Sequence, residues 1–213
     1  MPRGEIYVKY SPLGNNNLEQ YLLSEGAEPV VPGLVDFVIF KIYNRDVDVD
    51  IYGGRWIKQK VCRIFAAYIK KHQNAMIDAL KRSGRFRAPG NFDELHHYIK
   101  GYLGDGNKMG EGWLLTAEML ELIHSGTPNI VCTQPFGCLP NHIVGKGMIR
   151  RLKDDYPDSN IVAIDYDPSA TQINQENRIK LMLANAKGLS RRETAIPREP
   201  QPQVSPKLAH AHS

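Results

Sequence analysis

The segment at residues 131–147 reads VCTQPFGCLPNHIVGKG, an apolar run that stops at a turn and then continues with the pattern of a helix. Pro135 and Pro140 stiffen the turn because proline fixes the backbone φ, and Gly137 permits a backbone conformation that other residues resist. The same order recurs in the strand pattern NIVAIDYD at 160–167 and the helical pattern that follows it. Strands that alternate with helices predict a parallel sheet with helices on both faces.

Working outward from this segment, we predict a three-layer, flavodoxin-like α/β fold. Its four parallel strands are expected at 5–10, 28–31, 129–134 and 160–166, in the order 2-1-3-4. The first of these, around IYVKY, is assigned from its β-branched and aromatic content. A helical insertion separates strands 2 and 3, and its first part, residues 34–43, is apolar enough for either a buried strand or a buried helix.

The insertion also contains a long predicted helix at 55–83. Apolar residues recur along it at helical spacing, which predicts an amphipathic helix with its charges on the other faces. They are Ile57, Val61, Ile64, Phe65, Tyr68, Ile69, Ile77 and Leu80. Between Arg55 and Arg87 there are ten basic residues and one acid. A solvated face explains this charge most simply. A partner protein or the phosphates of CoA come next, and nucleic acid comes last because no nucleic-acid motif accompanies the charge.

Length and composition are those of one globular domain. The chain has 213 residues, of which 42 % are hydrophobic and 23 % charged. We predict a domain at 1–187 and a disordered, proline-rich basic tail at 188–213. No apolar run approaches the ~20 residues that span a bilayer, and no apolar signal core is found at the start, so we expect a cytoplasmic protein without a membrane partner.

The three cysteines differ in their surroundings. An odd number without framework spacing favours reduced thiols. Cys138 lies in the turn after a strand and just before a helix, a position that favours a thiolate and suits a nucleophile or a soft-metal ligand, although a buried, inert cysteine is an equal alternative. Cys132 within the strand and Cys62 on the long helix are expected to be structural.

Two nucleotide-binding classes are disfavoured at this turn. An acid such as Asp165 at the end of a strand can bind the ribose of a nucleotide, as in methyltransferases that use S-adenosylmethionine. However, FGCLPNHIVGKG contains neither the G-x-G-x-x-G fingerprint nor a G-x-x-x-x-G-K-[ST] phosphate loop. Asp165 and Asp167 are better explained as turn and helix-cap residues.

Residues 3–186 as a whole resemble the C-terminal lobe of the 2-hydroxyacyl-CoA dehydratase and benzoyl-CoA reductase family. The stretch from GEGWLLTAEMLELIHSG through QPFGCLP to AIDYDP carries the likeness, which is closest to the final region of large CoA-dehydratase-activase-related proteins. The resemblance implies flavodoxin-like lobes that together hold an iron–sulfur cluster of the [4Fe–4S] type. It also implies an ATP-dependent activator that delivers a low-potential electron for chemistry on an acyl-CoA.

The same resemblance assigns roles to individual residues. Cys138 is the implied metal ligand. The remaining implied cofactor-binding residues belong to a glycine-rich loop and to the cysteine turn: Gly110, Glu111, Gly112, Trp113, Gln134, Pro135, Phe136 and Gly137. A cluster generally needs three or four thiolates, so a partner polypeptide or lobe must supply the others.

The other lobe and the activator domain lie outside this sequence. A fragment, a split gene product and a degenerate remnant therefore all stay open, and we expect no activity from the chain alone. A hypothesis from another class is a non-catalytic α/β interaction module without a cluster, which docks through the basic helix or the tail.

Overall fold

The computed structural model describes residues 2–3, 6–167 and 171–195. Within these residues, three parallel strands form one sheet in the order β1 (Pro2–Arg3), β2 (Asn129–Pro135) and β3 (Asn160–Tyr166). β2 and β3 pair along their full length, whereas β1 contributes only two residues, opposite Val131 and Cys132. The protein is therefore a mixed α/β protein with a parallel sheet, and the two strands predicted at 129–134 and 160–166 are confirmed as neighbours.

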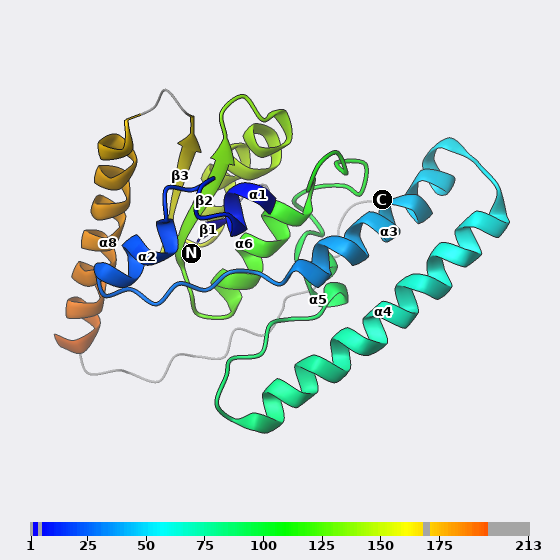
Figure 1. The fold of residues 1–213 in the computed structure, drawn as a ribbon, viewed down its shortest axis with the longest axis horizontal. Coiled ribbons are helices and arrows are strands. Elements are labelled where there is room, and N and C mark those ends of the chain that lie inside the picture. The colour runs from blue at the N-terminus through cyan, green and yellow to red at the C-terminus, as the bar shows by residue number, and fades with distance from the viewer. Residues whose placement is uncertain (1, 4–5, 168–170, 196–213) are drawn as a thin grey trace.

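Helices surround the sheet and extend beyond it (Figure 1). Their bounds are α1 Ile6–Tyr10, α2 Leu18–Ser24, α3 Leu34–Tyr52, α4 Trp56–Ser83, α5 Phe92–Tyr98, α6 Leu114–His124, the π-helical turn η1 Asn141–Gly145, the 3₁₀ turn η2 Lys146–Met148, α7 Ile149–Asp155 and α8 Gln172–Ala195. The insertion between the second and third predicted strands is helical, as expected. The periodicity of residues 34–43 fits either a strand or a helix, and these residues form the first half of α3.

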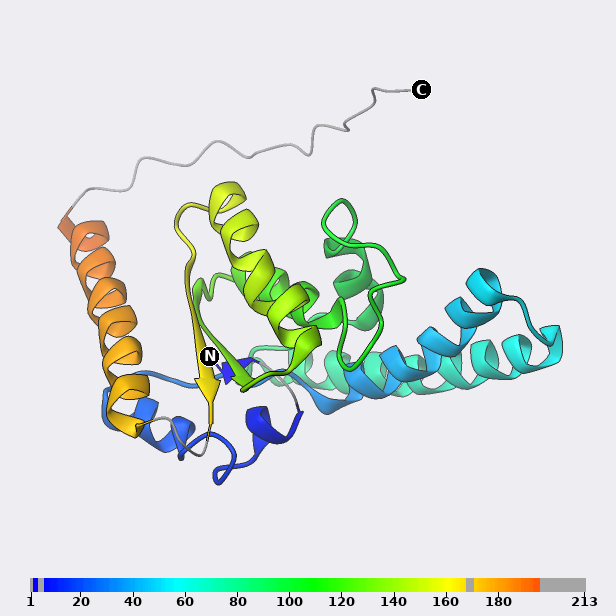
Figure 2. The same ribbon diagram turned by 90° about the horizontal axis from the view of Figure 1, so that it is seen from above.

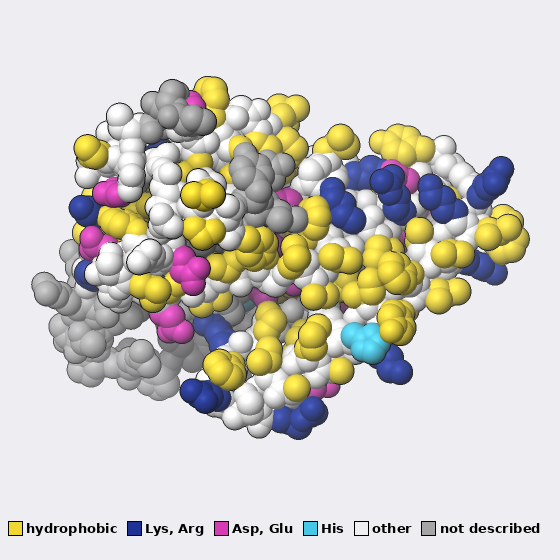
Figure 3. All heavy atoms as spheres, viewed as in Figure 1, with side chains coloured by type: hydrophobic (Ala, Val, Ile, Leu, Met, Phe, Trp, Pro, Cys, Tyr) yellow, Lys and Arg dark blue, Asp and Glu magenta, His cyan; other side chains and the backbone are white. Residues whose placement is uncertain are grey.

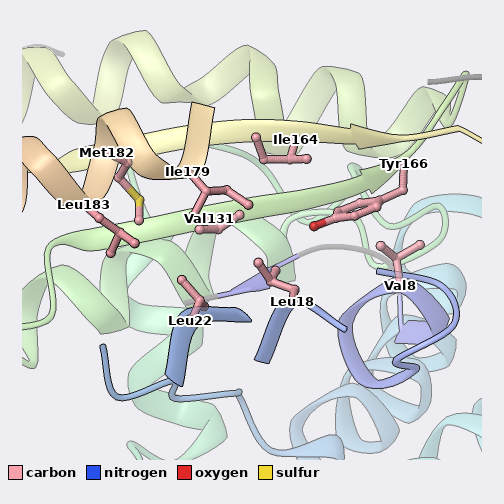
Figure 4. Close-up of a cluster of buried hydrophobic side chains, with 9 residues drawn as sticks. All are labelled: Val8, Leu18, Leu22, Val131, Ile164, Tyr166, Ile179, Met182 and Leu183. Carbon is pink, nitrogen blue, oxygen red and sulfur yellow. The ribbon is translucent and has the colours of Figure 1, made fainter. Parts of the chain in front are cut away.

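The alternation of side chains along β2 explains why both faces of the sheet are covered. Ile130 and Cys132 point to one face, where they pack with α6 and α7. Val131 points to the other face, where it meets side chains of α1, α2 and α8 (Figure 4). Figure 2 shows α8 on one side of the strands and the helices after β2 on the other. Because successive side chains of a strand point to opposite faces of the sheet, helices pack on both of its faces.

Two predicted strands are wrong. Residues 6–10 form the short helix α1, because this turn inserts Val8 into the core beside Leu18 and lets Lys9 reach Glu118 on α6. β-branched and aromatic content indicates a half-buried surface rather than a strand as such. Residues 28–31 form no strand, since Pro29 lacks the N–H donor that a sheet requires and Pro32 follows closely.

Helices α3 and α4 form an arm that projects away from the sheet (Figure 1). Its base is a separate buried cluster in which Ile39 and Phe40 of α3 meet Phe92 of α5 and Trp113. The long helix predicted at 55–83 is confirmed as α4, and its apolar residues are divided between a buried side and an exposed side. Ile77 is buried and Ile69 partly so, while the residues from Ile57 to Tyr68 that share the predicted stripe are exposed.

The chain's last described helix passes the predicted domain boundary. α8 continues to Ala195, eight residues beyond residue 187. The rest of the predicted tail, 196–213, lies outside the described residues. None of the described helices combines the length and the apolar character needed to cross a membrane.

Candidate functional site at the carboxyl end of β2

The turn after β2 holds Cys138 in a fixed backbone. Gly137 has φ +73°, a left-handed conformation that costs glycine little. Phe136 N donates to Tyr166 O at 3.2 Å, and Cys138 N donates to Pro135 O at 3.3 Å. His142 N then donates to Cys138 O at 3.0 Å, which starts the first helical turn. The cysteine backbone is thus hydrogen-bonded on both sides.

The segment that follows the turn is not the regular α-helix that the sequence predicted. It begins with the π-helical turn η1, followed by the 3₁₀ turn η2, and becomes α-helical only at Ile149. Such π-helical turns are frequent at functional sites. Its irregular path brings Asn141 back toward Cys138.

The thiol of Cys138 is partly exposed and has one polar neighbour. Asn141 Nδ2 donates to Cys138 Sγ at 3.1 Å, and Asn141 itself is 1 % exposed. Asn141 Oδ1 is buried and has no hydrogen-bond partner among the described residues. A hydrogen bond to sulfur supports a thiolate, whether it acts as a nucleophile or as a ligand.

Cys132 and Cys62 are placed differently from Cys138. Cys132 lies in the core cluster between β2 and α6, and a Cβ built on Gly145 would sit 3.4 Å from its sulfur. Cys62 lies on α4, in the arm. Among the described residues, no group of three or more His, Cys, Asp or Glu side chains could hold a metal ion. The described residues therefore do not build a three-ligand metal site around Cys138.

Two of the residues before Cys138 in the predicted motif, Gln134 and Phe136, are hydrogen-bonded to the adjacent strand β3. Gln134 and Pro135 are buried at the end of β2, and Gln134 Nε2 donates to Asp165 on the adjacent strand. Lys146 Nζ lies 3.5 Å from the other oxygen of Asp165. Asp165 is therefore engaged by side chains from β2 and η2, while Phe136 is 71 % exposed.

The glycine-rich loop at 104–112 lies against the cysteine turn. A pocket of about 180 Å³ lies between the loop and the cysteine turn. Another pocket, of about 370 Å³, lies beside Ser159 and is lined by neither segment. The smaller pocket is lined by 106–109 and Gly112 on one side and by Leu139, Pro140, Ile143 and Val144 on the other. A Cβ on Gly110 would lie 3.3 Å from Pro140 Cγ. The loop and the turn thus share one site.

Helix α3 anchors the loop through polar side chains. Lys41 Nζ donates to Gly110 O, and Asn44 Nδ2 donates to Lys108 O at 3.4 Å. Tyr43 Oη donates to Asp105 Oδ2 at 3.0 Å, and Asp105 also contacts His96 at 2.8 Å. Burial is the main cause that lowers the pKa of Lys41, while Glu111 opposes it.

Two of the four predicted loop residues face inward rather than into the pocket. Trp113 is fully buried, with its ring 5.0 Å from that of Phe40 in an edge contact, and Glu111 is 4 % exposed. Trp113 therefore stabilises the base of the loop, and Gly112 is the predicted loop residue that lines the pocket. Asn141, Lys146 and the α3 anchors were missed, because only the fold brings them to the turn.

Gly112 supports a first prediction. It has φ +49°, and a Cβ there would overlap the carbonyl oxygen of Asn107 and lie 2.7 Å from Lys108 Cα. Gly112→Ala should lower the free energy of unfolding by roughly 2–3 kcal/mol, because the backbone atoms around it cannot yield. Urea denaturation followed by circular dichroism measures this. Gly106→Ala is the control: no atom lies within 4 Å of the added Cβ, so an equal loss there would contradict the steric explanation.

Comparisons with protein-family models, with curated proteins and with solved structures find no match to this chain.

Proposed function

We propose that this chain is a flavodoxin-like lobe of a cytoplasmic iron–sulfur protein related to the 2-hydroxyacyl-CoA dehydratases and their activase-related proteins. The observation that carries the proposal is Cys138. Its thiol is partly exposed, is held by a rigid turn at the carboxyl end of β2 and accepts a hydrogen bond from Asn141. In open α/β sheets this end of the strands is where ligands bind.

The chain fits the role of a single-ligand donor. One partly exposed thiol is present at the site, and the described residues contain no group of three or more His, Cys, Asp or Glu side chains that could hold a metal ion. A [4Fe–4S] cluster would therefore be shared, with a partner polypeptide or lobe that supplies the remaining cysteines. When bound, such a cluster supplies low-potential electron transfer, here from an ATP-dependent activator toward an acyl-CoA.

The side chains around Cys138 support a partner that covers the thiol. Exposed apolar side chains surround the turn and the loop: Met109, Phe136, Leu139 and Ile143 are 75 %, 71 %, 68 % and 53 % exposed. Contiguous apolar side chains at a surface mark interaction sites, and a partner seated there would exclude water from the thiolate. Asn141 would hold the sulfur by its N–H, and the pocket between the loop and the turn would accept part of the partner or the acyl-CoA.

The test is Cys138→Ala in the chain purified without oxygen from its native cells, together with its partner polypeptides. We expect bound iron and acid-labile sulfide to fall at least fivefold relative to the unsubstituted complex, because one cluster ligand is lost. Cys62→Ala is the matched control, since Cys62 lies in the arm, and it should leave iron unchanged. Equal iron in both variants would exclude Cys138 as a ligand.

A non-catalytic interaction module is the second candidate, and the exposed apolar residues of α4 favour it. It predicts iron-free complexes that survive Cys138→Ala intact. The same purification therefore separates the two functions.

A further inference from the structure

The outer face of α4 carries an apolar stripe that no described part of the protein covers. The stripe consists of Ile57, Val61, Ile64, Phe65 and Tyr68, which are 57 %, 60 %, 71 %, 52 % and 60 % exposed. Figure 3 shows hydrophobic side chains gathered along the arm. Single exposed apolar residues are ordinary, but five neighbours on one helix face indicate a surface that is buried in some assembly.

The stripe is separate from the face by which α4 is already bound. Gln73 is buried, donates to Asp36 on α3 at 2.6 Å and accepts from the backbone of Phe92 at 3.3 Å. Gln73 comes nine residues after Ile64, which turns it about 180° away at roughly 100° per residue. Ile69 and Ile77, four residues before and after Gln73, are partly and fully buried on this same face, so α4 has apolar residues on two opposite faces and the described part of the protein covers one of them.

The spacing of the stripe fits another helix. Ile57, Val61, Ile64 and Tyr68 are separated by four, three and four residues. This is the heptad alternation by which helices pack side by side, and Phe65 lies at the edge of the seam that it makes. A helix that lies on a membrane surface presents a broader apolar face. The next position of the seam is Lys71, which ends it.

The charges beside the stripe define the partner. Lys58 and Lys60 flank the seam, Lys71 closes it, and none of these three forms an ion pair with a described residue. By contrast, Arg63, which is turned toward α3, is neutralised by Asp46 at 2.9 Å. We propose that the outer face of α4 docks an amphipathic helix of a partner protein whose apolar seam is flanked by Glu or Asp.

Two other occupants fit less well. A second copy would place α4 against α4, and each carries seven Lys and Arg residues against one Asp, so the two arms would repel. The other occupant is the C-terminal segment 196–213, which contains four prolines, two basic residues and one Glu. Proline is disfavoured in the interior of a partner helix, and the basic residues of this segment do not complement lysines.

The probe is a fluorescein-labelled synthetic 28-residue heptad peptide with Ile and Leu in the seam and Glu at the flanking positions. Its control replaces every flanking Glu with Lys. Fluorescence anisotropy with the full-length chain should show the acidic peptide bound at least tenfold more tightly than the basic one. Ile64→Asp should weaken that binding at least tenfold, whereas Leu181→Asp, at an exposed position on α8, should leave it unchanged.

Charge reversal supplies the second arm of the test. The variant Lys58→Glu, Lys60→Glu, Lys71→Glu should prefer the basic peptide, and because it changes only exposed side chains it should keep the circular dichroism of the parent chain.

The proposal is overturned if neither peptide binds, or if Ile64→Asp and Leu181→Asp behave alike. Binding to phosphatidylserine vesicles without peptide binding would replace it with a membrane surface. Sedimentation that shows a dimer, lost in Ile64→Asp, would replace it with a second copy. Bound iron does not enter any of these readouts, so the outcome is independent of Cys138.

Discussion

Trp113→Ala should destabilise the protein by about 3–5 kcal/mol, the range expected when a large buried aromatic side chain is removed. Trp113 is fully buried, and its ring contacts those of Phe40, Tyr43 and Phe92 at centroid distances of 5.0, 6.2 and 5.8 Å. These contacts join α3, α5 and the end of the glycine-rich loop. A domain of ordinary stability has about 5–15 kcal/mol in total, so the variant should unfold at much lower urea concentration.

The second tryptophan gives this prediction its control. Trp56 begins α4 and is 63 % exposed. Trp56→Ala should change the free energy of unfolding by less than about 0.5 kcal/mol, as exposed substitutions usually do. Urea titration of both variants by circular dichroism compares the two directly. Similar losses from both would show that the aromatic cluster around Trp113 does not stabilise the base of the arm.

Breaking the ion pair between Lys9 and Glu118 should cost about 3–5 kcal/mol, because either single substitution removes an opposite charge that contacts a buried one. Lys9 Nζ lies 3.1 Å from both carboxylate oxygens of Glu118, and the two side chains are 2 % and 1 % exposed. The pair joins α1 to α6. Glu118→Leu and Lys9→Met should each shift the urea midpoint strongly downward.

The double variant distinguishes a coupled pair from two separate packing defects. Lys9→Met combined with Glu118→Leu removes both charges and keeps side chains of similar size, so its loss should be smaller than that of either single variant. Chemical denaturation of all four proteins completes the cycle. Additive losses would mean that the pair contributes no coupling energy.

The second half of the fold could be predicted from sequence because its signals are local. Ile130 to Cys132 and Ile161 to Ile164 are short apolar runs between turn residues, and the prolines and glycine of 135–140 mark the connection. The strand predicted at 5–10 was wrong because the sequence IYVKY fits a strand and a buried helical turn equally well. The helical conformation of this segment lets Lys9 bind Glu118, which is more than one hundred residues away in the sequence.

Within the candidate site, the position of Cys138 in a turn after a strand was predictable, and so was the structural place of Cys132. Asn141 was not, since its contact with the thiol depends on the π-helical turn, which has no sequence signature. The residues of the exposed stripe on α4 were predicted together with Ile69 and Ile77 as the apolar residues of one amphipathic helix. Periodicity reports that a helix has apolar residues on a side, but it does not report whether this chain or another one covers them.

The pairing of β1 with β2 also has a consequence for the order in which the protein assembles. Arg3 pairs with Cys132, so the two partners are separated by 129 positions in the chain. At roughly 5–20 residues per second, a ribosome needs about 6–26 s to pass from one to the other. The arm of α3 and α4, whose helices are joined by three residues, closes by local contacts on a far shorter timescale. The nascent chain therefore carries a finished arm for seconds before its sheet can exist.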